Sequence, residues 1–186
     1  ALSRIHPGYA LASDRYARAL KQRNAQLKAS PGKACIWNTE LVKWGALIVE
    51  GRLKFIKALN ANVADIYNKL YNKRVELRYL SNFKLGESIE LSLRKALERN
   101  FEKDREKRHT TIGPHRDNYE IVLKDTGKSS KVFASQGQTR SLSIALKLAV
   151  IREIKRNADK NPIVLVDDVL LEIDSKRRAL ILDELL

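Results

Sequence analysis

The stretch Ser135-Gln136-Gly137-Gln138-Thr139-Arg140, an amphipathic segment to about residue 157, and then Pro162-Ile163-Val164-Leu165-Val166-Asp167-Asp168 decide the fold. A polar turn with a glycine opens a helix, and a short apolar run ends in two carboxylates. The run from 163 to 166 is too short for a helix, so we predict a central parallel strand there. Open α/β sheets bind ligands at the carboxyl ends of such strands. We therefore expect a mixed α/β fold with a ligand site beside this strand.

The turn before the helix has two interpretations. Ser135 to Gly137 are expected at a helix N-terminus, where free N–H groups and the helix dipole attract anions. Gly137 would let the backbone approach a phosphate, and the Ser135 hydroxyl can donate to it. The alternative is that Ser135 only caps the helix.

The carboxylates fit nucleotide hydrolysis of the Walker B type. Asp167 would hold a Mg²⁺ that bridges two phosphates, and Asp168 would orient the attacking water. The alternative is a solvated turn. Asp174, just before a helix predicted over 175–186, is either a helix-flanking carboxylate or a contact between subunits.

Periodicity predicts the remaining helices. A helix is predicted over residues 14–28, with Ser13 as its cap. A second, with a single apolar seam, is predicted over residues 37–71. This seam indicates a helix that packs on a core, in preference to a long coiled coil. A third helix follows Ser88 and continues to about Lys107, with a charged end that should be exposed to solvent.

Alternating apolar residues predict strands. They are expected at 75–79 and at 119–123, and a return strand at 131–133 completes a hairpin. Gly113-Pro114 forces a turn before the second strand, and an Arg116–Asp117 ion pair could pin it.

Composition favours a polyanionic partner. The chain has 186 residues and a formal net charge of +14, and residues 1–108 carry 23 Lys and Arg against 11 Asp and Glu. Such an excess favours nucleic acid, although it could be a solvated surface. Charge density alone selects the following candidates for DNA contact: Lys54, Lys57, Lys73, Arg74, Arg105 and Lys107. The single Cys35 favours a reducing cytoplasm, and no apolar run is long enough for a membrane span.

Four strings together resemble the RecF family of bacterial recombination mediators, whose ATPase heads are related to ABC and SMC heads. They are Thr111-Ile112-Gly113-Pro114-His115-Arg116-Asp117, Ala134-Ser135-Gln136-Gly137-Gln138-Thr139-Arg140-Ser141, Ala145-Leu146-Lys147-Leu148-Ala149 and Asp167-Asp168-Val169-Leu170-Leu171-Glu172-Ile173-Asp174. The resemblance covers nearly the whole chain.

The resemblance implies a helical arm lobe at 1–108 and the second half of an ABC-type ATPase lobe at 109–186. It assigns the signature motif, which acts in trans on the other subunit's nucleotide, to Ser135, Gln136, Gly137, Gln138 and Arg140. It also makes Asp167 the metal-linked residue, Asp168 the catalytic one and Asp174 the D-loop. It implies ATP and Mg²⁺ as cofactors, an ATP-dependent homodimer, and double-stranded DNA near single-strand junctions. The implied protein partners are RecR with RecO, in DNA replication, repair and the SOS response.

One element of an ATPase is missing from the sequence. No G-x-x-x-x-G-K-[ST] phosphate loop occurs, and the chain starts at Ala1 without any methionine. We therefore expect residues ahead of Ala1 to carry this loop, and the chain alone to bind ATP negligibly and not to hydrolyse it.

Two other functions remain open. The first is a metal-dependent nuclease or toprim-like site built on Asp167, Asp168 and Asp174, with Glu120 as a fourth carboxylate. The second is a non-enzymatic basic helical module that binds DNA and in which the Asp pair is structural.

Overall fold

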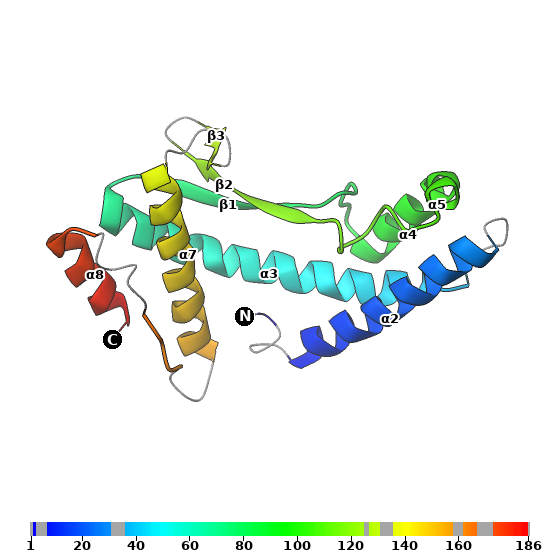
Figure 1. Ribbon diagram of the computed structural model, residues 1–186, viewed down its shortest axis with the longest axis horizontal. Helices are drawn as coiled ribbons and strands as arrows, with labels where there is room; N and C mark the ends of the chain where they lie inside the picture. Colours follow the sequence, from blue (N-terminus) through cyan, green and yellow to red (C-terminus); the bar gives the residue numbers. More distant parts are fainter. Residues whose placement is uncertain are drawn as a thin grey trace. The chain divides into compact units, whose positions relative to one another are not determined.

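The computed structural model describes residues 2, 7–30, 36–124, 127–130, 136–157, 162–166 and 173–185 (Figure 1). The elements run in the order α2 (Pro7–Ala29), α3 (Asn38–Tyr71), β1 (Val75–Leu80), α4 (Ile89–Arg99), α5 (Phe101–Lys107), β2 (Asn118–Leu123), β3 (Lys128–Ser129), α7 (Gln136–Asn157) and α8 (Ser175–Leu185). The expected mixed α/β class is confirmed.

The chain forms two compact units. Unit 1 contains Phe55–Arg78 and Tyr119–Leu186, and unit 2 contains Leu2–Lys54 and Tyr79–Asn118. The division passes through α3 and through the paired strands β1 and β2, so both units are built from discontinuous pieces of sequence. Residue 108, the boundary expected from charge and motifs, lies inside unit 2. The assignment of an arm lobe and an ATPase lobe stays a prediction.

Unit 1 has a core in which α3, the sheet, α7 and α8 meet. The second half of α3 buries apolar residues at steps of three and four, which is the spacing of one helix face. The buried members are Leu59, Val63, Ile66, Tyr67 and Leu70 from α3, Val75 and Leu77 from β1, Leu123 from β2, Leu142, Ala145, Leu148 and Ala149 from α7, and Ile181 from α8. The interpretation of α3 as a core helix is confirmed.

The sheet has the order β1-β2-β3. β2 and β3 pair antiparallel with Val122 opposite Ser129 and Leu123 opposite Lys128. Gly127 adopts φ +66° in the turn between them, a left-handed conformation that glycine takes without strain. The predicted hairpin is therefore present, but its return strand begins at Lys128, and the expected strand at 131–133 lies outside the described residues.

Unit 2 has a separate core between α2, the first half of α3 and α4. Its buried members are Ala12, Tyr16 and Ala19 from α2, Leu41, Val42, Ile48 and Val49 from α3, Phe83, and Leu93 and Leu97 from α4. Each half of α3 thus packs on a different set of partners.

Three predicted helix details are wrong. α2 starts at Pro7, not after Ser13, because proline fits the first turn of a helix and the residues after it continue the pattern. The predicted third helix is two helices, α4 and α5, separated at Asn100, whose φ of −99° and ψ of 8° are not helical. The end of the third helix is not wholly exposed, since Asp104 is fully buried.

The expected strand at 163–166 is also wrong. Residues 162–166 have no regular structure, and Ile163 and Leu165 are 93% and 94% exposed. A central strand needs hydrogen-bonding neighbours on both sides. The three strands of the described sheet pair with one another and not with this run.

Candidate functional site

The predicted signature segment lies at the start of α7 in unit 1. Ser135 lies outside the described residues, and Gln136 is the first residue of α7. Gly137 and Arg140 are exposed and Gln138 is half-buried. A side chain built at Gly137 would meet nothing within 4 Å, and the first turn of α7 has no acidic residue. Among the described residues, the first turn of α7 therefore carries no negative charge, which suits an anion-binding helix end.

Charged side chains hold α7 in place. Arg152 donates to Asp65 of α3 at 2.8 Å and to Glu184 of α8, and Lys69 approaches the same two carboxylates at 3.3 and 3.2 Å. The hydrogen bond from Arg152 lowers the pKa of Asp65. Burial alone would raise the pKa of Glu184, but hydrogen bonds from Arg152 and Lys69 lower it overall. This cluster fixes the axis of α7, and with it the direction of the helix N-terminus.

Asp174 caps α8. Its carboxylate accepts a hydrogen bond from the backbone N–H of Arg177 at 3.0 Å and pairs with the Arg177 guanidinium at 2.9 Å. The backbone hydrogen bond is the main reason why the pKa of Asp174 is lowered. The helix-flanking interpretation of this residue is confirmed. Its assignment to a D-loop contact stays a prediction.

A shallow groove of about 350 Å³ lies beside Asp174, between the end of α3 and the first turn of α8. Arg177 crosses its floor, donating to the Leu70 carbonyl at 3.0 Å and stacking 4.7 Å from the Tyr71 ring. The lining residues are Lys69, Leu70, Tyr71, Asn72, Asp174, Lys176, Arg177 and Leu180. Three cations against one carboxylate make this groove basic.

Asp167 and Asp168 lie outside the described residues, so their roles as metal-linked and catalytic carboxylates stay predictions. Within the described ranges no three His, Cys, Asp or Glu side chains gather to hold a metal ion. Glu120 and Asp174 are both described and belong to no such group. The described part of the chain therefore gives the nuclease alternative no support.

The string from Thr111 to Asp117 forms a rigid turn in unit 2. Gly113 has φ +132°, and the backbone N–H of Arg116 donates to its carbonyl at 2.9 Å. Arg52 donates to the Pro114 carbonyl at 2.5 Å. Asp117 accepts from the Tyr79 hydroxyl and, at 2.8 Å, from the backbone N–H of Asn82. The expected Arg116–Asp117 ion pair is wrong for these described residues, because that carboxylate binds β1 and the loop that follows it.

His115 connects this turn to α2. Its Nδ1 is 2.7 Å from the Tyr16 hydroxyl and its Nε2 is 3.1 Å from the Thr110 carbonyl. Desolvation by partial burial lowers the pKa of His115 and raises that of Tyr16. The neutral imidazole therefore accepts from Tyr16 and donates to Thr110.

The six candidates for DNA contact are all exposed but do not belong to one unit. Lys57, Lys73 and Arg74 are in unit 1, and Lys54, Arg105 and Lys107 are in unit 2. Arg105 is paired with Glu102 at 2.7 Å. Their contact with DNA stays a prediction.

Sequence reasoning missed a buried polar network in unit 2. Arg23 of α2 is fully buried and donates at 2.7 Å to Asp104 of α5 and to Thr110, and at 2.8 Å to Asn38. The signal was available, because Arg23 falls on the spacing of the buried α2 positions 12, 16, 19 and 27.

Comparisons with known proteins identify the relatives of this chain. No family model matches it. It is 35% identical over 176 residues to the DNA replication and repair protein RecF of Clostridium botulinum (strain ATCC 19397 / Type A), covering 91% of this chain and 48% of that protein. It is 34% identical over 186 residues to RecF of Clostridium perfringens (strain SM101 / Type A), covering 97% and 51%. The chain thus spans about half the length of these curated relatives.

Solved structures give the same result. The recombination mediator protein RecF-ATP in the RecFOR pathway superposes with a TM-score of 0.89 at 27% identity, over 99% of this chain and 52% of that one. RecF-ATPrS matches with a TM-score of 0.87 at 26% identity, over 97% and 51%.

The fold places the chain in the class of mixed α/β proteins to which the solved RecF-ATP structure belongs. Within this class the chain is RecF-like along nearly its whole length, and the resemblance predicted from four motifs is confirmed. No helix in the described ranges is both long and apolar enough to cross a membrane.

Proposed function

We propose that this chain is part of a RecF-like DNA replication and repair ATPase that binds ATP with Mg²⁺, dimerises on ATP and helps to load a recombinase at single-strand gaps in the cytoplasm. The observation that carries the proposal is that the first turn of α7 has no acidic residue, in a chain that superposes on RecF-ATP. Double-stranded DNA near junctions and RecR with RecO are the proposed partners.

In this proposal the two parts of the site serve different nucleotides. The α7 N-terminus, with Gly137, Gln138 and Arg140, contacts the terminal phosphate bound by the other subunit. Asp167 and Asp168 act on the nucleotide of their own subunit. Mg²⁺ would neutralise charge on the phosphates, while this chain's carboxylates hold the ion and orient water.

Dimerisation tests the signature role. In a RecF-length protein that contains this sequence, Ser135→Arg should abolish ATP-driven dimers in light scattering while leaving ATP binding to the monomer unchanged. Ser143→Arg is the matched control, because Ser143 is exposed on α7 two turns further on. Persistence of ATP-dependent dimers in the Ser135→Arg variant would refute the role.

The isolated 186-residue chain gives a second test. Because its sequence has no phosphate loop, equilibrium binding of labelled ATP should be negligible, and no phosphate should be released. Micromolar affinity for ATP would show that the chain holds a nucleotide without that loop, which contradicts the proposed division of the site.

A further inference from the structure

Helix α2 in unit 2 is unusually poor in acidic residues. It carries Arg15, Arg18, Lys21, Arg23 and Lys28 but a single acidic residue, Asp14, in its first third. No Asp or Glu then occurs in the sequence until Glu40. A helix with such a composition has a positive field along most of its length.

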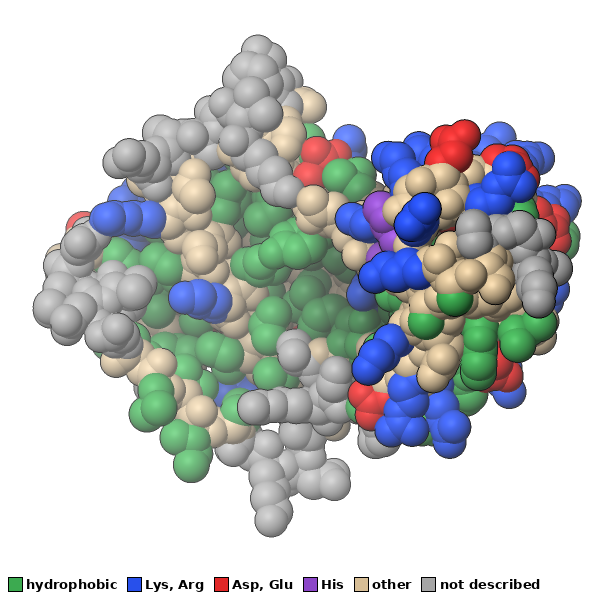
Figure 2. Space-filling view, turned by 45° about the vertical axis from the view of Figure 1, so that its right-hand side comes forward, with side chains coloured by type: hydrophobic (Ala, Val, Ile, Leu, Met, Phe, Trp, Pro, Cys, Tyr) green, Lys and Arg blue, Asp and Glu red, His purple; other side chains and the backbone are tan. Residues whose placement is uncertain are grey.

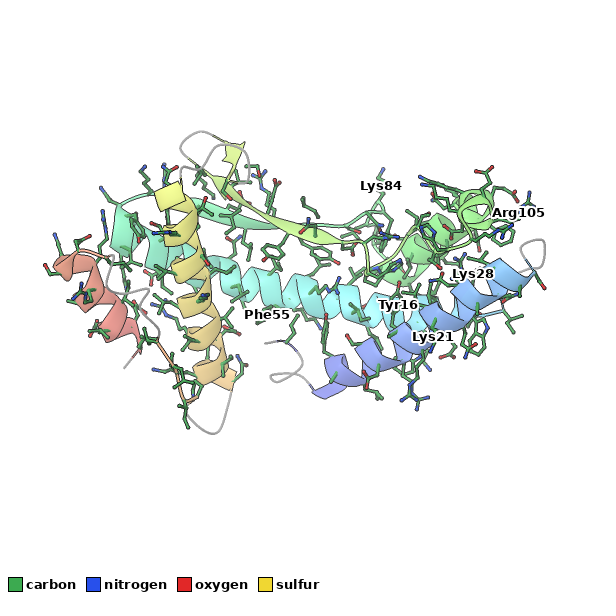
Figure 3. All side chains as sticks on the ribbon, viewed as in Figure 1. Tyr16, Lys21, Lys28, Phe55, Lys84 and Arg105 are labelled. Atoms are coloured by element: carbon green, nitrogen blue, oxygen red, sulfur yellow. The ribbon has the colours of Figure 1, made fainter. Side chains whose placement is uncertain are left out.

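One cation of α2 is buried and the other four are exposed to solvent. Arg23 points inward and pairs with Asp104. The other four, Arg15, Arg18, Lys21 and Lys28, are exposed, and none has an ion-pair partner within 4 Å among the described residues. Figure 3 shows Tyr16 on the side of α2 that faces α3 and Lys21 on the outer side. Because an α-helix turns by about 100° per residue, Arg18, Lys21 and Lys28 lie on the side of α2 opposite its buried residues, whereas Arg15 lies on its flank. We call the surface of Arg18, Lys21 and Lys28 the outer face of α2; it is positive, and its cations have no ion-pair partner among the described residues.

Other charged helices of this unit are different. In α4 and α5 six cations alternate with five carboxylates, and pairs such as Arg94–Glu90 and Arg105–Glu102 form along the surface. Alternation of this kind is typical of a solvated helix surface. In Figure 2 blue side chains outnumber red ones on the visible face of this unit. The difference lies in the carboxylates: five cations and one acid give α2 a net charge of +4, whereas six cations and five acids give α4 and α5 together +1.

The spacing of these cations fits a phosphate backbone. At 1.5 Å per residue, Arg18 and Lys28 are about 15 Å apart along α2, with Lys21 between them on the same face. Duplex DNA has one charge per roughly 1.7 Å of its axis, so several phosphates lie within this length. The exposed residues beside these cations include Ala17 and Ala25, whose small side chains let a partner approach closely.

Between Arg18 and Lys28 this face has no exposed aromatic or large apolar side chain, although Leu11, nearer the start of α2, is 52% exposed. Protein interfaces have aromatic or large apolar residues at their centre, and single-stranded nucleic acid stacks its bases on aromatic side chains. From Asp14 to Ala29 the one aromatic residue, Tyr16, is 4% exposed, and the largest apolar side chains, Leu20 and Leu27, are half-buried and buried. The face offers charge without stacking platforms, which suits the sugar-phosphate backbone of a duplex.

We propose that the outer face of α2 binds the phosphate backbone of double-stranded DNA, through Arg18, Lys21 and Lys28. This proposal rests on the proposed DNA-binding function. It names a defined surface for DNA contact, whereas the six earlier candidates were selected by charge density alone. The contact is independent of base sequence, because it involves only phosphates.

Binding of a labelled duplex of two helical turns to the 186-residue chain tests this surface by fluorescence anisotropy. The variant is Arg18→Gln/Lys21→Gln/Lys28→Gln. The matched control is Lys95→Gln/Arg99→Gln/Lys103→Gln, which removes three exposed cations of the same unit from α4 and α5. Titrations between about 50 and 200 mM salt give the number of phosphate contacts from the slope of log affinity against log salt.

The α2 variant should bind the duplex about tenfold more weakly or worse, and its salt slope should fall by about 2.7, since each lost contact removes about 0.9. The control should keep most of the slope. Equal losses in both variants, or an α2 variant that binds like the unchanged chain, would overturn the surface while leaving DNA binding intact. An unchanged chain that fails to bind any duplex would overturn the DNA-binding function itself. Tighter binding of poly-glutamate than of the duplex at equal charge would indicate an acidic protein as the partner and overturn the proposal.

Discussion

A single ion pair determines how α2 and α5 meet in unit 2. Arg23 and Asp104 both have 0% exposed side chains and are 2.7 Å apart, and Asp104 also accepts from the backbone N–H and hydroxyl of Thr111 at 2.8 and 2.6 Å. The charged heptapeptide of α5 gives no sign of this, because five of its seven residues are solvent-exposed charges like those of any surface helix. Asp104 differs from the other charged residues of α5 only in having a partner, Arg23, on the buried face of α2.

Asp104→Ala should destabilise the chain by about 3–5 kcal/mol, because it leaves the Arg23 charge buried without a partner. Urea unfolding measures this cost. Glu102→Ala, which removes a partner from the exposed pair with Arg105, should cost at most about 1 kcal/mol. The double change Arg23→Met/Asp104→Leu should recover much of the loss, since it removes both charges. An Asp104→Ala cost no larger than that of Glu102→Ala would contradict the buried pair.

Gly113 is a second position at which a single added atom, a Cβ, should change the stability of the chain. Its φ of +132° is unfavourable for any other residue, and a Cβ would collide with the Tyr16 hydroxyl. Gly127 also has a positive φ, but a Cβ there would meet nothing within 4 Å. Gly127→Ala should therefore cost about 1–2 kcal/mol from the left-handed backbone alone, and Gly113→Ala should cost more. Thermal unfolding of the two variants checks the order, and equal costs would show that the turn moves away from Tyr16.

At the scale of elements, the local pattern of apolar residues correctly predicted those helices and strands that one buried face defines. Periods of two and of three to four gave β1, β2, α3 and α7 nearly to their ends, because both periods describe faces that bury apolar residues. The failures have separate causes. Proline at Pro7 was compatible with an earlier helix start, and the break at Asn100 has no strong local signal. The run at 163–166 has the composition of a buried strand, but burial of a strand depends on neighbours that a local window cannot show.

The packing of α3, α7 and α8 in unit 1 should weaken in acid. The pKa values of Asp65 and Glu184 are lowered from 3.8 and 4.5, so ionisation of these carboxylates favours the folded state. Their contribution is complete above about pH 5 and is lost as the pH falls through the folded-state pKa values.

The urea midpoint of the chain should therefore fall between about pH 5 and pH 3. Arg152→Gln should lower the midpoint at pH 7 and reduce this dependence, because Arg152 binds both carboxylates. Lys147→Gln is the control, since Lys147 is an exposed cation on the same helix. An unchanged pH dependence in Arg152→Gln would mean that the acid sensitivity comes from other carboxylates.

The described residues of the molecule form two cores, and the apolar run at 163–166 belongs to neither. Ile163, Leu165 and Val166 are 93%, 94% and 49% exposed, whereas the apolar residues of α3 fill both cores. An exposed run of this kind is typical of a surface that another segment or chain covers. The relatives are about twice as long as this chain, and the ATPase proposed above needs a phosphate loop that its sequence lacks.

Two matched substitutions separate this run from the cores. Leu165→Ala should change the free energy of unfolding of the 186-residue chain by no more than about 0.5 kcal/mol, as at other exposed positions. Leu77→Ala, at a strand position that is 3% exposed, should cost about 2–5 kcal/mol. Leu165→Ala should also lower the light scattering caused by association of the 186-residue chain with itself, because the substitution removes exposed apolar surface. In a RecF-length protein, where further sequence would cover this run, the cost of Leu165→Ala should approach that of Leu77→Ala. An equal cost of both substitutions already in the 186-residue chain would place the run in a core of this chain, and the carboxylates of Asp167 and Asp168 would then need no further sequence to be held in place.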